Sequence, residues 1–158
     1  MPNINEILLH SFKNENITVS DSQLAQFIRY YELLLEWNEK INLTAITEPA
    51  DVAVKHFADS LLALKMLPDD NWQNKKMIDI GTGAGFPAIP LKIMKQSLDV
   101  ILFDSLQKRL NFLDTVCQEL ALANIRTVHG RAEDSGQDKT MREQYDIACA
   151  RAVAKMPV

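Results

Sequence analysis

Hydrophobic side chains recur at helical spacing in the first part of the chain. Over residues 24–35 they return every three or four positions, which places them on one face of an α-helix. Ser20, followed three residues later by Gln23, is a capping-box signature for the start of this helix, which we expect to run to about Glu39. A similar spacing over residues 4–12 predicts a shorter helix before it.

A second helical region is expected after the break in the pattern at residues 42–44. Proline suits the first turn of a helix, so Pro49 predicts a helix start, with Thr47 as the expected N-cap. Apolar residues then continue at helical spacing until Pro68 ends the pattern. The sequence therefore predicts an N-terminal helical segment over residues 1–70.

From residue 77 onward, short apolar runs alternate with helical patterns. Helices are expected over about 87–95 and 106–120, and Asn124 is the expected left-handed residue that stops the second one. The four expected strands cover residues 77–80, 100–103, 125–128 and 147–150. Such alternation is typical of a parallel sheet covered by helices. It predicts an α/β fold, with a Rossmann-like sheet of about four parallel strands in residues 71–158.

The chain ends shortly after the fourth expected strand. An uncovered edge strand leaves unpaired backbone groups at the rim of a sheet, which natural proteins avoid. We therefore expect either that the sequence is part of a longer protein or that another chain covers this edge.

The composition is that of an ordinary globular protein. Of the 158 residues, 47% are hydrophobic and 24% are charged, and the net charge of −4 excludes a polycationic nucleic-acid coat protein. This net charge does not exclude a nucleic-acid enzyme with a local basic face. Cys117 and Cys149 lie far apart, so we expect neither a disulfide framework nor a metal centre. With no signal-peptide core and no apolar run of about 18 residues, we expect a cytoplasmic protein without a membrane partner.

Glycines at 81, 83 and 85 lie directly between the first expected strand and a helix. This turn is at the carboxyl end of the strand, where open α/β sheets bind ligands, and glycine lets the backbone approach a ligand closely. Phe86 stands where the dinucleotide fingerprint has its third glycine, and no lysine follows Gly85 as a P-loop requires. The turn therefore disfavours pyrophosphate and triphosphate ligands. A turn that serves only tight packing is the structural alternative.

Two carboxylates narrow the choice of ligand. Asp79, two residues before Gly81, disfavours a polyphosphate and favours a ligand that carries positive charge. Asp104 ends the second strand, where a carboxylate can accept hydrogen bonds from both hydroxyls of a ribose. S-adenosylmethionine carries an ammonium, a sulfonium, a ribose and an adenine. We therefore expect it to be the cofactor and expect Asp79, Gly81, Gly83, Gly85 and Asp104 to contribute to its site.

The segments after the third and fourth strands suggest the rest of the site. Ala132 and Glu133 are expected beside the adenine, with a solvated polar loop as the alternative. The segment at 150–153 lacks the Asn/Asp-Pro-Pro-aromatic motif of many amine methyltransferases and the Pro-Cys nucleophile of pyrimidine methylation. An acceptor with a free lone pair, such as guanine N7, remains consistent with this. Because such an acceptor needs no general base, proximity and alignment would supply the catalysis, and we assign no catalytic residue.

Several blocks of the sequence resemble one known family. The chain resembles the glucose-inhibited division protein B family, the ribosomal RNA small subunit methyltransferases G, over nearly its whole length. The matching blocks are residues 37–38, 42–46, 56–61, 79–90, 104–109, 130–133 and 150–154. Members of this family continue for several more strands, so the resemblance also implies that the C-terminal part is missing here.

The resemblance implies a function and a set of contacts. It implies S-adenosylmethionine-dependent methylation of guanine N7 in 16S ribosomal RNA in the bacterial cytoplasm, with the RNA or the 30S ribosomal particle as partner. By motif, Gly81 and Phe86 would contact the cofactor, Ala132 and Glu133 would line the adenine, and Arg151 would complete the pocket. A small-molecule methyltransferase and a non-catalytic adenosylmethionine-binding module remain alternatives.

Other polar residues have less specific interpretations. His56 is either a histidine on a helix face or a link between the helical segment and the site, and Asn38 and Asn42 are expected to form caps and turn hydrogen bonds. We expect Trp37 and Phe57 in the core. An ordinary solvated surface is expected for Lys75, Lys76, Lys92, Lys95, Lys108, Arg109 and Arg131. The alternative hypothesis is that several of them, with Arg151 and Lys155, form a basic face that meets RNA phosphates.

Overall fold

The structure, a computed structural model, describes residues 2–151 and begins with a helical segment. Two long helices, α1 (Ile4–Asn14) and α2 (Asp21–Asn38), are followed by a series of short helical turns. These are α3 (Pro49–Asp51), the π-helical η1 (Val52–Ala58), α4 (Asp59–Leu61), η2 (Leu62–Lys65) and η3 (Asp69–Trp72). The predicted helical character of the first part of the chain is confirmed. A domain boundary near residue 70 stays a prediction.

The first residues of two helices test the predicted capping signals. The predicted capping box of α2 is confirmed, because the Gln23 amide donates to the Ser20 hydroxyl at 3.2 Å and the Ser20 amide donates to the Gln23 side chain at 2.8 Å. The prediction that Thr47 caps the next helix is wrong. Glu48 is the N-cap, without a side-chain hydrogen bond, and the fixed φ of Pro49 is enough to start the turn.

Four parallel strands form the sheet, which confirms the predicted α/β fold. They are β1 (Lys76–Ile80), β2 (Asp99–Asp104), β3 (Ile125–His129) and β4 (Ile147–Ala150), in the order β3-β2-β1-β4. The connecting helices are α5 (Ala88–Met94), α6 (Gln107–Glu119) and α7 (Ala132–Ser135). The strand order changes direction between β1 and β4, and open sheets of this kind bind ligands beside such a point.

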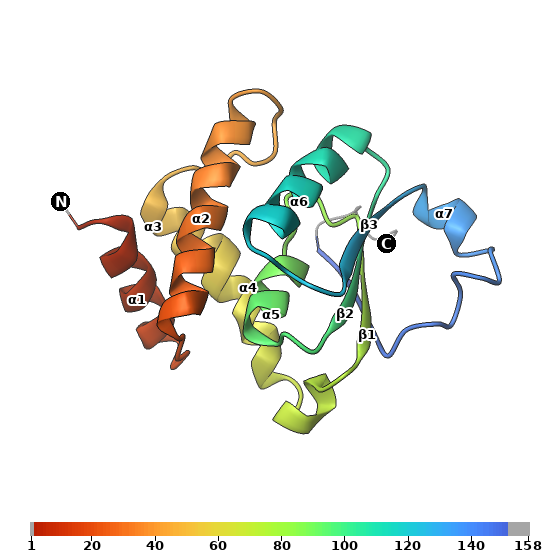
Figure 1. Cartoon of the computed structure of the whole chain (residues 1–158), viewed down its shortest axis with the longest axis horizontal. Helices are drawn as coiled ribbons and strands as arrows, with labels where there is room; N and C mark the ends of the chain where they lie inside the picture. The colour runs from red at the N-terminus through yellow and green to blue at the C-terminus, as the bar shows by residue number, and fades with distance from the viewer. Residues whose placement is uncertain (1, 152–158) are drawn as a thin grey trace, which may run out of the picture.

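The two faces of the sheet have different covers. The helices α1 to α6 all lie on one side of the sheet, and α7 lies on the other (Figure 1). Because side chains alternate along a strand, Met77, Val100 and Leu102 join the large core beneath the helices. On the opposite face, Ile78 and Phe103 belong to a smaller apolar cluster that also includes Met141 and Tyr145.

The turn after α6 differs from the sequence prediction. Asn124 has the expected left-handed backbone, with φ of 55°, but it leads into β3 and does not end the helix. The helix ends at Glu119, and Ala121, with φ of 52°, is the left-handed residue that follows it. Alanine rarely adopts this conformation, so nothing in the sequence indicated that the helix ends before residue 121.

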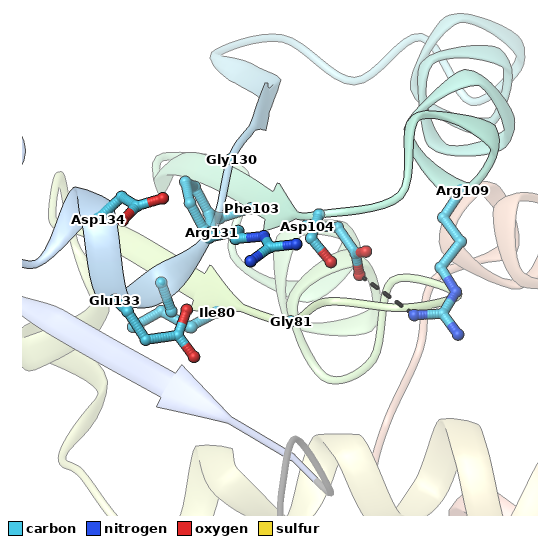
Figure 2. Close-up of a pocket in the computed structure, with 11 residues that line it drawn as sticks. Ile80, Gly81, Phe103, Asp104, Arg109, Gly130, Arg131, Glu133 and Asp134 are labelled. Atoms are coloured by element: carbon cyan, nitrogen blue, oxygen red, sulfur yellow. Dashed lines mark ion pairs between the residues drawn. The ribbon is translucent and has the colours of Figure 1, made fainter.

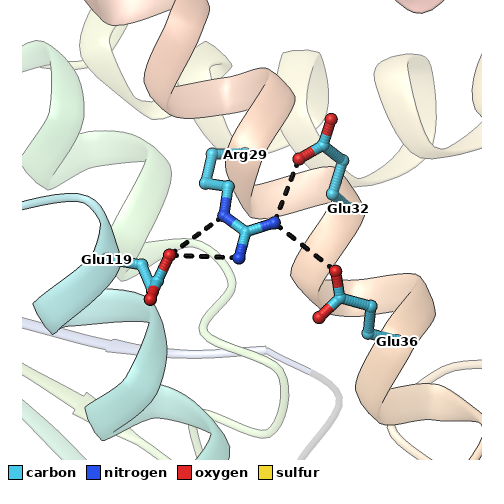
Figure 3. A network of polar contacts seen from close by, with 4 residues as sticks. All are labelled: Arg29, Glu32, Glu36 and Glu119. Carbon is cyan, nitrogen blue, oxygen red and sulfur yellow. Dashed lines mark hydrogen bonds and ion pairs between the residues drawn. The ribbon is translucent and has the colours of Figure 1, made fainter.

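Contacts from α2 join the helical segment to the sheet domain. The side chains of Gln23 and Gln26 donate to the carbonyl groups of Ile93 and Leu120, at 3.3 and 2.9 Å. Arg29 adds a surface network with three carboxylates, Glu32 and Glu36 of α2 and Glu119 of α6 (Figure 3). One continuous apolar core lies beneath these contacts and includes buried residues of both parts, among them Phe27, Tyr30, Phe57, Ile89 and Leu113.

Two kinds of feature are absent from the part of the chain that the structure describes. Within residues 2–151, no helix is long and apolar enough to cross a membrane. Over the same residues, no cluster of histidine, cysteine and carboxylate side chains could hold a metal ion.

Candidate cofactor site at the carboxyl edge of the sheet

A cavity of about 640 Å³ opens where β1, β2 and β3 end. Its walls come from the end of β1, the end of β2 with the first turn of α6, and the segment that leads from β3 into α7. Figure 2 shows Arg131 extending from the β3 side toward Asp104, while Arg109 of α6 pairs with Asp104. Four of the predicted site residues line this cavity, namely Gly81, Asp104, Ala132 and Glu133.

The glycine turn is built from left-handed backbone conformations. Gly81, Gly83 and Gly85 have φ angles of 65°, 59° and 98°, which residues with a Cβ rarely adopt. Gly85 is also tightly enclosed, because a Cβ there would lie 2.6 Å from the Tyr30 hydroxyl and 2.7 Å from Cδ1 of Ile89. Gly81 lines the cavity, whereas Gly83 and Gly85 give the turn its shape.

Asp104 holds this turn against the end of β2. It is buried, and its Oδ2 accepts from the Gly83 amide at 3.0 Å while its Oδ1 accepts from the Leu106 amide at 3.0 Å. The Arg109 guanidinium lies 3.6 Å from Oδ2. A carboxylate has about four lone-pair positions, so acceptor capacity remains on the cavity side.

Asp79 lies beneath the turn and does not line the cavity. Its side chain is fully buried, and Oδ2 accepts from the Thr82 hydroxyl at 3.0 Å and from the Ala88 amide at 3.3 Å. Oδ1 has no hydrogen-bond partner among the described residues, and burial raises the pKa of this carboxyl to about 7. Asp79 therefore ties the glycine turn to the first turn of α5, and its predicted contact with the cofactor stays a prediction.

The segment after β3 forms the opposite wall of the cavity. The Gly130 amide donates to the Asp104 carbonyl at 3.1 Å, which draws this segment against the end of β2. A Cβ at Gly130 would lie 3.0 Å from the Phe103 ring, so any other residue would require this ring to shift by a few tenths of an ångström. Ala132 and Glu133 follow at the start of α7, where the small Ala132 side chain leaves room for a flat group.

A second cluster surrounds Phe86, directly after the glycine turn. The His56 ring stacks on Phe86 with 4.4 Å between centroids and 10° between planes, and the Arg151 guanidinium lies 5.3 Å from the Phe86 centroid. Arg151 also contacts Nδ1 of His56 at 3.2 Å and pairs with Asp59 at 3.1 Å. Phe86 and Arg151 thus lie together, outside the lining of the cavity, and their cofactor contacts stay predictions.

Some residues that shape the site were not predicted from the sequence. Arg109, Ser105 and Arg131 line the cavity without having been assigned to it, and Tyr30 of α2 donates to the Ala84 carbonyl within the turn at 2.5 Å. Arg109 carried a usable signal, because it lies one helical turn after the strand-ending Asp104. Tyr30 carried none, since it looks like any other member of its apolar helix face.

The outcomes for the other polar residues are mixed. Asn38 is confirmed as a turn residue, because its Oδ1 accepts from the Leu43 and Thr44 amides at 2.8 and 3.0 Å. The placement of Lys92 on a basic surface is wrong. Its side chain is buried, and its ammonium donates to the carbonyl groups of Gln96 and Leu98 after the end of α5.

Two aromatic residues were expected in the core. Phe57 is confirmed in the core, and Trp37 is partly buried against it. Ala152, Val153 and Lys155 lie outside the described residues.

Comparison with solved structures shows the class of fold. A protein-L-isoaspartate O-methyltransferase from Plasmodium falciparum, solved in complex with S-adenosyl-L-homocysteine, matches with a TM-score of 0.59 and 16% identity. The match covers 99% of this chain and 77% of that chain. Together with the four-stranded parallel sheet, it shows that the fold is that of the class I methyltransferases.

Sequence comparison identifies the family. The GidB family, described as rRNA small subunit methyltransferase G, matches residues 23–158, and the chain belongs to this family. The ribosomal RNA small subunit methyltransferase G of Streptococcus gordonii is 54% identical over 144 residues, 91% of this chain. The protein of that name from Alkaliphilus oremlandii is 50% identical over 157 residues, 98% of this chain. The chain spans 60% and 64% of the lengths of these two relatives.

Proposed function

We propose that this chain carries the S-adenosylmethionine-binding part of a methyltransferase that modifies guanine N7 in 16S ribosomal RNA. The observation that carries the proposal is the cavity between the glycine turn, Asp104 and the β3 segment, in a chain of the rRNA small subunit methyltransferase G family. The relatives in that family are named ribosomal RNA small subunit methyltransferase G, and the choice of guanine N7 in 16S RNA is part of the proposal.

The strand order supports one orientation of the cofactor. Because the sheet runs β3-β2-β1-β4, the predicted contacts follow one another along its carboxyl edge. Adenine would lie against Ala132 and Glu133 after β3, and the ribose hydroxyls would donate to Asp104 at the end of β2. The methionine part would cross Gly81 at the end of β1 toward Arg151 at the end of β4.

The charges around the cavity suit this ligand better than a polyphosphate. Among the residues that the structure describes, three carboxylates line it, Asp104, Glu133 and Asp134, against two guanidinium groups, those of Arg109 and Arg131. Arg109 is already paired with Asp104. This net negative charge would repel a triphosphate and attract a sulfonium and an ammonium.

In this proposal the protein does not need to activate either reactant chemically. The cofactor supplies an activated methyl group, and guanine N7 offers a lone pair without a proton to remove. The residues of this chain then act by binding the cofactor, fixing its orientation and excluding water from the turn. No general base is part of the proposal.

The partner in this proposal is 16S ribosomal RNA or the 30S ribosomal particle, in the bacterial cytoplasm. Exposed cations near the site, such as Arg131 and Lys108, would contact phosphates. Replacing both by glutamate should weaken RNA binding and reduce its dependence on salt. Unchanged affinity and salt dependence in a binding titration would contradict this role.

Calorimetric titration with S-adenosylhomocysteine tests the cofactor site. We expect saturable binding by the chain and its loss in Gly81→Arg, because the new side chain would occupy the cavity. Gln118→Arg, which adds the same side chain on the exposed face of α6, is the matched control and should bind normally. Equal binding by both variants would contradict the assignment of the pocket.

Methyl transfer tests the substrate. Labelled S-adenosylmethionine is incubated with the chain and either unmodified 16S RNA or 30S particles, and the product is digested to locate 7-methylguanine. Transfer to N7 supports the proposal. Cofactor binding without transfer would favour a non-catalytic module, and transfer to small acceptors alone would favour a small-molecule methyltransferase.

A further inference from the structure

His56 lies where the helical segment meets the end of the sheet. It belongs to the π-helical stretch η1 and is only 8% exposed. One face of its ring stacks on Phe86, and both of its nitrogens have partners. Nδ1 lies 3.2 Å from a terminal nitrogen of Arg151, and Nε2 lies 2.9 Å from the Thr44 hydroxyl.

These partners fix the protonation of the ring. A guanidinium has donors and no acceptor, so Nδ1 of His56 must present a lone pair to Arg151. The proton of the neutral ring is therefore on Nε2, which donates to the Thr44 hydroxyl. Burial and the Arg151 charge both lower the pKa of His56, to about 4, in agreement with a ring that stays neutral.

The two partners of Arg151 affect its charge in different ways. Asp59 offers a carboxylate at 3.1 Å, but its side chain is 54% exposed and its attraction is screened by water. His56 offers a buried, neutral acceptor that orients the guanidinium without cancelling its charge. An arginine held in this way remains available to an anionic group that arrives at the carboxyl edge of the sheet.

We propose that His56 is a positioning residue, which as the neutral Nε2–H tautomer holds Arg151 over Phe86 so that its charge faces the carboxylate end of the cofactor. This inference rests on the proposed function, since it concerns the same cofactor. It links the helical segment to the site through one imidazole. Preorganising Arg151 would lower the conformational entropy lost when the cofactor binds.

Two substitutions separate this role from simple packing. His56→Asn keeps an acceptor, Oδ1, at the position of Nδ1 and removes most of the ring, whereas His56→Phe keeps a ring on Phe86 and removes the acceptor. A packing role would tolerate phenylalanine better, and a positioning role would tolerate asparagine better. Thermal melts of both variants show whether each one is folded.

Calorimetric titration with S-adenosylhomocysteine gives the first readout. We expect His56→Asn to bind within about threefold of the unchanged chain and His56→Phe to bind about tenfold more weakly, the scale of one hydrogen bond to a charged group. If the phenylalanine variant does not fold, His56→Gln, whose amide lies at the Nε2 position, takes its place with the same expectation. Asparagine that binds no better than phenylalanine or glutamine would overturn the inference.

Nuclear magnetic resonance gives a second readout that needs no cofactor. The imidazole ¹⁵N shifts of the unchanged chain at pH 7 should show the Nε2–H tautomer of His56, and His56→Phe should speed rotation of the Arg151 guanidinium while His56→Asn should not. An Nδ1–H tautomer or a charged ring would overturn the inference. If the unchanged chain did not bind S-adenosylhomocysteine at all, the proposed function would fail, and these spectra would still decide the role of His56.

Discussion

Position 85 requires glycine for two reasons, its backbone conformation and the lack of space for a Cβ. The other glycine positions of the turn share only part of this requirement. Its φ of 98° strains any other residue, and the space for a Cβ is already taken by Tyr30, Ile89 and Leu113. At Gly83, with φ of 59°, the atom nearest to an added Cβ would be 4.0 Å away. In the sequence the three glycines look equivalent. In the structure, backbone strain alone explains the glycine at 83, whereas strain and steric exclusion together explain the glycine at 85.

Substituting these two glycines measures the difference. Gly83→Ala should cost about 1–2 kcal/mol, the strain of a left-handed residue. Gly85→Ala adds steric overlap and should lower the free energy of unfolding by about 1–3 kcal/mol more. Urea denaturation of both variants gives the comparison, and equal losses would contradict the packing around Gly85.

Two buried titratable groups act in opposite directions on the pH dependence of stability. The pKa of His56 is lowered to about 4, so its contribution is present above pH 6.5 and is lost as the pH falls toward 4. The pKa of Asp79 is raised to about 7, so its contribution is present below pH 4 and is lost as the pH rises toward 7. Between pH 4 and pH 6.5 the two effects offset each other.

Replacing Asp79 by asparagine should expose the effect of His56. We expect the stability of Asp79→Asn to rise more steeply with pH between 4 and 6.5 than that of the unchanged chain, by at most about 1.4 kcal/mol per pH unit. Denaturant midpoints measured at several pH values give both slopes. Parallel slopes would mean that Asp79 does not keep its proton in the folded chain.

Helix α2 stabilises the glycine turn as well as the core. Tyr30 stacks on Phe57 and on Phe86, with 5.3 and 5.4 Å between ring centroids, and its hydroxyl donates to Ala84 inside the turn. A helix that looks like a simple amphipathic element in the sequence therefore fixes the shape of a loop more than fifty residues away. Hydrophobic spacing predicted the helix and its buried face, but no spacing rule predicts which loop that face will contact.

Removing one hydroxyl tests this role of α2. Tyr30→Phe should lower stability by about 1–3 kcal/mol, because the buried Ala84 carbonyl loses its donor, and should also weaken S-adenosylhomocysteine binding. Tyr31→Phe is the matched control, since the Tyr31 hydroxyl donates to the Thr47 carbonyl at 3.3 Å, away from the turn. Similar losses of affinity in both variants would contradict a specific role for Tyr30.

At the scale of the whole molecule, the sequence predicted more of the fold than of the site. The four strands and the glycine turn were predictable because the alternation of short apolar runs with helical patterns and the spacing of the glycines are local signals. The aromatic stack of Tyr30, Phe86 and His56 was not, because it joins residues 26 to 56 positions apart. The burial of Lys92 was missed for a different reason, since a lysine is rarely expected inside a core.

The central claim is that the cavity at the carboxyl edge of the sheet binds the methyl donor. The most direct test is a titration of ¹⁵N-labelled chain with S-adenosylhomocysteine, followed by amide chemical shifts. We predict the largest shifts at Gly81, Asp104 and Ala132–Glu133, and smaller shifts at the apolar face around Tyr145. Shifts confined to that apolar face, or no shifts at saturating ligand, would contradict the claim.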